Sequence, residues 1–309
     1  MSARTDALAA LARAGAIDWR RRAGWRTMVR AARLLARPEK LARLLELGLV
    51  KDVLVPARGA EAFSFLTRAR FLARSLGLEQ RVDCALHHYA YEQATFSSAY
   101  VDAVYRGEGL ELWRVASEEH VFAIRLLVAN DNLFEGLLSV VAFVDGQRVC
   151  VFSFSYVDAA IFGAPPGPIV FVTRKQSGRH PEEQQAFARA FHHSSPPYFC
   201  LAALAGIALA IGTRAVAAIR HDAHPSWQPD EAPAMRTSYD EFWAVFQATE
   251  LDEKAYRIPV PLEAGDLAEV SAKHRRRAKL RRQHWSEVTE SARAALHAHL
   301  AAPPTSQGS

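Results

Sequence analysis

Residues 137–156 spell LLSVVAFVDGQRVCVFSFSY, two runs rich in β-branched and aromatic residues with Asp145-Gly146 between them. Residues of these types favour β-strands. An Asp-Gly pair favours a type I′ turn, whose backbone twist matches that of an antiparallel hairpin. The segment therefore predicts a β-hairpin with strands over residues 137–144 and 149–156.

Further β-rich runs flank this hairpin. Residues 111–115 and 121–128 precede it, and residues 169–173 follow it after a stretch rich in Pro and Gly. Short strands separated by turn residues are typical of antiparallel sheets. The sequence therefore predicts an antiparallel β-meander.

Two helices and another strand are predicted after the meander. Pro181 suits a first helical position, because the amide there has no helical partner. A second, apolar helix follows Pro197 and ends at Gly212, a typical C-terminal cap. Residues 215–219 form a short buried strand. This α+β order of elements resembles the acyl-CoA N-acyltransferase (GNAT) fold, and the resemblance implies a GNAT-like core.

The 309 residues divide into three predicted parts. Residues 1–78 are rich in Ala, Leu and Arg and predict a basic α-helical segment. Residues 79–300 form the α+β domain with its flanking helices. Residues 301–309 are small and polar with two prolines, and predict a disordered tail.

The cysteines and the apolar runs bear on the compartment. Cys84, Cys150 and Cys200 are far apart and show no CxxC spacing, which fits a reducing cytosol. The first residues lack the continuous apolar core of a secretory signal. Residues 198–212, the longest apolar run, fall short of the roughly 20 residues that span a membrane as a helix. We expect a cytoplasmic protein that also contacts the inner membrane peripherally.

Positive charge is concentrated in two stretches, although the net charge is only +5. Residues 13–43 carry ten Lys or Arg against two acidic residues, and residues 273–282 carry seven against none. Trp19 and Trp25 make residues 13–43 a candidate for peripheral contact with an anionic membrane. The sequence contains no nucleic-acid-binding signature, so a nucleic-acid partner is not expected.

Several short motifs are spread along residues 79–300: His88-Tyr89, Glu135-Gly136, Tyr239-Asp240 with Phe242-Trp243, Tyr256 with Ile258-Pro259, and Arg277-Ala278 with Arg281-Arg282. In these residues and their spacing, the chain from Arg81 to Trp285 resembles the bacterial VirK/YbjX family. The resemblance implies a role in envelope stress or virulence but no defined reaction. The chain departs from the family pattern around Gly178, around His192 and just before His224, which implies an altered substrate.

Five residues after the last meander strand form a candidate phosphate-binding loop: Arg174, Lys175, Gln176, Gly178 and Arg179. Backbone amides at a strand-to-helix turn point outward, and the positive end of the helix favours an anion. The GNAT resemblance implies that the anion is the phosphate of an acyl-CoA or acyl-carrier co-substrate. The alternative is a solvated basic loop.

Three residues are candidates for proton transfer. His192 and His224 each lie next to a buried element, and a histidine can accept a proton near neutral pH. Glu135 is the carboxylate alternative, placed at a strand entrance. Each is also a candidate for a purely structural role. The aromatic residues Tyr239, Phe242 and Trp243 have helical spacing and predict core packing.

Two functions follow from these features. The first is an acyltransferase that moves an acyl group from a CoA or carrier-protein thioester to an amine or hydroxyl of a peptide, lipid or small metabolite. It needs no permanently bound cofactor. The alternative is a non-enzymatic envelope-stress protein that binds an anionic membrane or an acidic partner. No motif with metal-ligand spacing is present, so we expect no metal site.

Overall fold

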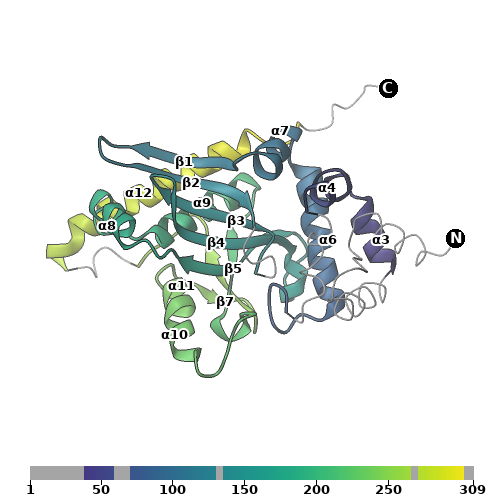
Figure 1. The fold of residues 1–309 in the computed structure, drawn as a ribbon. Coiled ribbons are helices and arrows are strands. Elements are labelled where there is room, and N and C mark those ends of the chain that lie inside the picture. Colours follow the sequence, from purple (N-terminus) through teal and green to yellow (C-terminus); the bar gives the residue numbers. More distant parts are fainter. Residues whose placement is uncertain (1–37, 59–69, 130–134, 266–270, 303–309) are drawn as a thin grey trace, which may run out of the picture.

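A single mixed sheet forms the centre of the molecule (Figure 1). The computed structural model describes residues 38–58, 70–129, 135–265 and 271–302. The eight strands are ordered β1-β2-β3-β4-β5-β6-β8-β7. Their bounds are β1 Leu110–Ala116, β2 Val121–Val128, β3 Leu138–Val144, β4 Gln147–Asp158, β5 Pro168–Ser177, β6 Ala215–Ile219, β7 Thr249–Glu250 and β8 Ala255–Pro259.

The described helices lie before, between and after these strands. The α-helices are α3 Pro38–Glu46, α4 Val55–Arg58, α6 Leu78–Thr95, α7 Ser98–Val101, α8 Pro181–Ala190, α9 Pro196–Ala210, α10 Ala232–Arg236, α11 Phe242–Ala244 and α12 Ala272–His297. The π-helical segments are η1 Leu49–Leu54, η3 Asp102–Arg106 and η6 Thr237–Glu241, and the 3₁₀ turns are η4 Ala159–Phe162 and η5 His221–Ala223. An α+β fold with an antiparallel meander is thereby confirmed.

The hairpin at the centre of the sheet forms as predicted. Asp145 and Gly146 have φ of 50° and 79°, the positive values that a type I′ turn requires at both central positions. Strands β3 and β4 pair across it from Val144 with Gln147 to Leu138 with Phe154. Because the turn residues impose this geometry locally, the sequence alone was enough to predict it.

Strand β5 is longer than predicted. It was expected to end at residue 173, but it continues to Ser177, so Arg174, Lys175 and Gln176 lie in a strand and not in a strand-to-helix loop. The reason is the length of β4, whose residues Cys150–Ser153 pair antiparallel with this polar end of β5. The prediction of a loop at residues 174–176 is wrong.

A fork divides the sheet beyond its middle. Strands β5 and β6 are parallel but pair over only three positions, from Val170 with Val216 to Val172 with Ala218. Beyond these pairs β5 runs on beside β4, whereas the chain after β6 turns away at η5. On the far side of β6, β8 and then β7 continue the sheet in antiparallel pairing.

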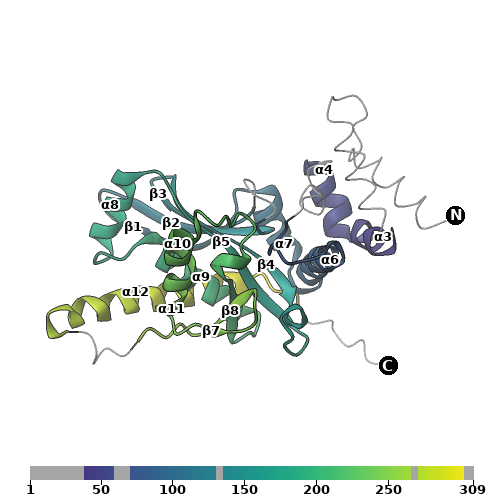
Figure 2. The ribbon, with the colours of Figure 1, turned by 90° about the horizontal axis from the view of Figure 1, so that it is seen from below.

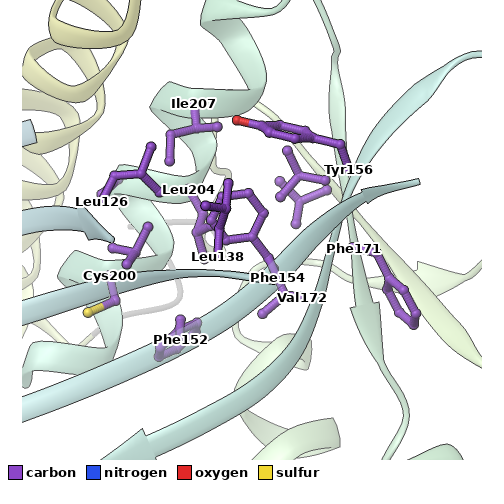
Figure 3. Packing of buried hydrophobic residues seen from close by; sticks show 14 of the residues in the cluster. Leu126, Leu138, Phe152, Phe154, Tyr156, Phe171, Val172, Cys200, Leu204 and Ile207 are labelled. Carbon is purple, nitrogen blue, oxygen red and sulfur yellow. The ribbon is translucent and has the colours of Figure 1, made fainter. Parts of the chain in front are cut away.

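Helices α9 and α12 cover one face of the sheet in both ribbon views (Figures 1 and 2). Helix α9 is buried almost throughout, and its Cys200, Leu204 and Ile207 lie against apolar residues of the central strands (Figure 3). Gly206 brings α9 close to α12, because a Cβ there would lie 2.3 Å from the carbonyl oxygen of Thr289. The predicted apolar core helix and its Gly212 cap, at φ 78°, are confirmed.

The amino-terminal helices join the same hydrophobic core. Leu41, Leu44 and Leu49 belong to one cluster with residues of the sheet and of α12. Residues 1–37, 59–69 and 303–309 lie outside the described residues. They include most of the basic segment 13–43 and most of the predicted tail. Across the part of the chain that is described, no helix combines the length and apolar character needed to cross a membrane.

Candidate functional site

A cluster of four side chains lies at the fork where β6 diverges from β5: Tyr239, His224, Glu135 and Arg174. Tyr239, in η6, places its hydroxyl oxygen 3.2 Å from the Lys175 amide nitrogen, so the backbone N–H donates to it. The same oxygen lies 3.5 Å from the Lys175 carbonyl oxygen. Tyr239 therefore occupies backbone groups of β5 that a neighbouring strand would otherwise pair. The Tyr239 ring packs against Trp243, and both side chains are buried. The predicted core packing of these two residues is confirmed, although the Tyr239 hydroxyl also binds the backbone of β5.

His224 is the second group at the fork. Its Nδ1 accepts a hydrogen bond from the Ser226 amide at 3.1 Å, which places the proton of a neutral ring on Nε2. Nε2 then lies 3.1 Å from the Tyr239 hydroxyl oxygen. The side chain is only 4% exposed, and burial lowers the pKa of His224 to about 4. At neutral pH the ring is therefore an uncharged hydrogen-bond donor.

Glu135 brings a buried carboxylate to the same cluster. Its Oε1 accepts a hydrogen bond from the Ser226 hydroxyl at 3.0 Å and lies 3.8 Å from His224 Nε2. The next residue, Gly136, has φ 148°, and a Cβ there would lie 2.6 Å from the Phe154 amide nitrogen. Only glycine fits this approach, so the Glu135-Gly136 pair sets the direction from which the carboxylate enters the site.

Arg174 supplies the cation. Its Nε lies 3.3 Å from Glu135 Oε2, and its Nη2 donates to the side-chain oxygen of Gln176, two residues along the same strand face. The Arg174 side chain is about as buried as that of Glu135. An ion pair this buried is sensitive to the loss of either partner, because the remaining charge stays out of water.

Lys175 points to the opposite side of β5. Its ammonium donates to the Ser238 carbonyl oxygen at 2.8 Å and lies 4.7 Å from the centre of the Phe242 ring. Burial lowers the pKa of Lys175. Arg174 and Lys175 were predicted to bind one phosphate together, but neighbouring residues of a strand face opposite sides.

Gly178 and Arg179 lie apart from this cluster. The Gly178 amide donates to the Val149 carbonyl oxygen at 2.7 Å, and a Cβ at Gly178 would lie 2.4 Å from the Arg148 carbonyl oxygen. The glycine therefore allows close packing of β4 against the end of β5. Arg179 is exposed. The five residues predicted to hold phosphate thus occupy separate environments.

His192 lies elsewhere in the molecule. It follows α8 with φ 53°, is exposed, and stacks on His284 of α12 with ring centres 5.6 Å apart. No contact recorded between described residues joins it to the fork. Of the three residues predicted for proton transfer, the structure brings Glu135 and His224 together and leaves His192 apart.

A second histidine and carboxylate lie beside the fork and were not predicted as site residues. His221 Nδ1 is 2.6 Å from Asp240 Oδ2, and the His221 amide donates to Asp240 Oδ1 at 2.9 Å. The Tyr256 hydroxyl donates to the same carboxylate at 3.1 Å. The sequence did contain a signal for this pair, because Asp240 directly follows Tyr239. That adjacency places the His221–Asp240 pair beside the Tyr239–His224 pair.

The cluster as a whole combines complementary groups. Glu135 can accept a proton, Arg174 can stabilise negative charge, and neutral His224 can donate a hydrogen bond. His224 is not arranged to accept a proton, because its one lone pair already takes the Ser226 amide. Glu135 is therefore the candidate base, and His224 orients the groups around it.

Comparison with curated proteins and with solved structures finds no match. A family model described as "Protein of unknown function (DUF535)" matches residues 25–294, which is most of the chain. DUF535 is the VirK/YbjX family, to which the motifs at Glu135 and Tyr239 pointed. The matched range includes the whole fork and its side chains. The chain therefore belongs to the DUF535 family.

Proposed function

We propose that this protein is an acyltransferase whose reaction takes place at the fork between β5 and β6. The observation that carries the proposal is the fork itself: a parallel pair that separates after three positions, within an otherwise antiparallel sheet. The order of strands, with β8 inserted between β6 and β7, resembles the GNAT arrangement. Fold likeness alone does not establish chemistry, so the polar cluster at the fork is the second support.

The proposed roles follow from the contacts. The nitrogen or oxygen of the acceptor attacks the thioester carbonyl carbon, and Glu135 takes the acceptor's proton. The C–S bond then breaks, and the leaving thiolate takes this proton from Glu135, which restores the carboxylate. Arg174 and the Nε2–H of His224 stabilise the negative charge that develops during attack. In the structure the Tyr239 hydroxyl accepts a hydrogen bond from the Lys175 amide. The acyl donor therefore has two ways to bind: it displaces this hydroxyl from β5, or it leaves the hydroxyl in place and binds at the opposite edge of the cluster.

The test measures release of free thiol. Acyl-CoA donors of different chain length and acyl-carrier protein are incubated with the full chain and panels of amine and hydroxyl acceptors. We expect thiol release with at least one donor, and Glu135→Gln should lower its rate by about 100-fold or more. Glu182→Gln, at an exposed position of α8, is the matched control and should retain the rate.

Two results would count against this proposal. If no donor releases thiol and none raises the melting temperature of the protein, the acyltransferase assignment fails. If thiol is released but the Glu135→Gln variant keeps the full rate, the reaction does not use Glu135 as the base.

A second candidate function is binding to an anionic membrane surface through α12. The first half of this helix extends beyond the sheet in both ribbon views (Figures 1 and 2). Its Lys273, Arg276, Arg277 and Lys279 are exposed, and the helix has no acidic residue before Glu287. Basic residues on such a surface are attracted to anionic headgroups, and salt weakens the attraction.

Vesicle co-sedimentation tests this second candidate. We expect binding to vesicles containing phosphatidylserine but not to neutral vesicles, and weaker binding in the triple variant Arg276→Gln, Arg277→Gln, Lys279→Gln. The control removes three exposed arginines elsewhere, Arg106, Arg114 and Arg189. Equal loss in both triple variants would assign the attraction to overall charge and not to α12.

A further inference from the structure

The face of the sheet opposite α9 carries an ordered set of polar and apolar side chains. Strand pairing places Leu127, Ser139, Ser153 and Arg174 in one row across β2, β3, β4 and β5. The Ser139 and Ser153 hydroxyl oxygens in this row are 3.0 Å apart. The next row includes Val141 beside Val151, and the next pairs Phe143 with Arg148. Arg125 of β2 and Gln176 of β5 complete the row of the two valines. One end of this face is therefore polar, and its middle has two valines between polar side chains.

A cavity of about 260 Å³ lies over these rows. Leu127, Val141, Phe143 and Val151 form its apolar lining, and Arg148 and Arg174 supply cationic groups. The described residues that line it include no carboxylate. The cavity thus combines an apolar surface with two guanidinium groups, and that of Arg174 is also paired with Glu135. Guanidinium groups beside apolar side chains are the combination that recognises an amphipathic anion.

Arg174 is oriented to serve such a ligand. Glu135 contacts its Nε and Gln176 contacts its Nη2, so two positions of the guanidinium are fixed by the protein. Within the described part of the chain, its Nη1 has no hydrogen-bond partner. A guanidinium held in this way is already in place when an anion arrives, so little side-chain entropy is lost on binding.

We propose that this cavity binds a small amphipathic anion, a short hydrocarbon chain that ends in a carboxylate or phosphate. The anionic head contacts Arg174 at the polar end, the chain covers Val141 and Val151, and Arg148 at the other end of the cavity adds attraction at longer range. A cavity of about 260 Å³ suits a short hydrocarbon chain and not a long one. The assignment does not depend on acyl transfer, because it rests on the shape and charge of the cavity.

Binding to the full chain is measured by ligand-observed NMR and isothermal titration, without any acyl donor. The probes are hexanoate and hexyl phosphate, with hexanol and acetate to test the chain and the charge separately. We expect at least one of the two anions to bind about tenfold or more tightly than both hexanol and acetate. The stronger of the two anions then identifies the headgroup.

Two variants locate the site. Val141→Phe fills the cavity without changing charge and should weaken binding of the anion about tenfold or more. Val115→Phe makes the same change at an exposed position of β1 and should not weaken it. Arg148→Gln removes one cation of the lining and should also weaken binding, whereas Arg114→Gln on β1 should not. This second pair keeps the test decisive if Val141→Phe fails to fold.

Three outcomes would overturn the proposal. They are absence of binding by both anions, equal binding of hexanol and the anions, and unchanged binding in folded Val141→Phe or Arg148→Gln. Because these measurements use no thioester, a failure of thiol release would leave the cavity assignment intact. Equally, a failure of anion binding would not affect the test of acyl transfer.

Discussion

Among the described residues, two carboxylates are buried, and their surroundings differ. Glu92, on α6 and 1% exposed, accepts a hydrogen bond from the Tyr100 hydroxyl at 2.5 Å and another from Tyr105. Its Oε2 lies 3.0 Å from His88 Nε2. Glu135 instead faces the Arg174 cation, beside a cavity.

The difference indicates what each cluster does. Around Glu92, His88 Nδ1 also accepts the Tyr156 amide of β4 at 3.1 Å, so the network ties α6 to the sheet and to η3. Each of its described partners is a protein group, and burial raises the pKa of Tyr100 and Tyr105. Around Glu135, a cation faces a cavity and an incompletely paired strand. A closed network stabilises the fold, whereas one that borders a cavity can bind and react.

The largest expected effect comes from removing the closed carboxylate. Glu92→Ala leaves two tyrosine hydroxyls without their acceptor and removes the carboxylate next to the His88 ring, and should lower the free energy of unfolding by roughly 3–5 kcal/mol. Glu135→Ala should cost less, because Arg174 keeps Gln176 and borders a cavity that can admit water. Urea unfolding of both variants measures the difference.

The comparison would break if Glu135→Ala proved the more destabilising of the two. Glu92→Gln is a second variant in case Glu92→Ala does not fold. The amide keeps the shape but replaces one acceptor oxygen with a donor, so it should still be destabilising. A cost below about 1 kcal/mol for Glu92→Gln would mean that the tyrosine hydroxyls find other partners.

The next effect concerns pH and the open cluster. The pKa of His224 is about 4 in the folded chain, against 6.5 as its ordinary value. Between these values the unfolded state binds the extra proton, so this contribution to stability is complete above pH 6.5 and is lost as pH falls toward 4. At 1.36 kcal/mol for each pH unit, the total is on the order of 3 kcal/mol.

His224→Gln should flatten the stability profile over this range. The measurement is the urea midpoint of the wild type and the variant at intervals from pH 7 to pH 4.5. His193→Gln, at an exposed position, is the matched control and should follow the wild type. Parallel profiles for the wild type and His224→Gln would show that His224 is not held in its neutral form.

Local signals made the hairpin predictable, but not the end of β5. Asp145-Gly146 specifies its turn through positive φ alone, which needs no distant contact. Residues 174–177 are polar and resemble a loop, and they become a strand only because β4 extends far enough to pair with them. Tertiary pairing outweighed local propensity there.

The candidate site was predictable in part for the same reason. Glu135 and His224 were identified by residue type, but their approach depends on the fork, which no local pattern encodes. Tyr239 was assigned to the core from its aromatic spacing, and its ring is indeed buried, while its hydroxyl reaches the site. His192 was predicted on the same chemical grounds as His224, but the turn after α8 places its ring against His284.

The smallest effect, and the most direct comparison of the two clusters, is the loss of one hydroxyl from each. Tyr100→Phe removes a donor to a buried carboxylate and should cost about 1.5–3 kcal/mol, the range for hydrogen bonds to charged groups. Tyr239→Phe removes a hydroxyl that contacts the neutral groups of Lys175 and His224, and should cost about 0.5–1.5 kcal/mol. Both side chains are buried, so the two substitutions differ mainly in the partner that is lost. Urea unfolding of both variants measures the two losses in free energy of unfolding. Equal losses, or a larger loss for Tyr239→Phe, would mean that the cluster at the fork stabilises the fold as much as the network around Glu92 does, and that its role is structural.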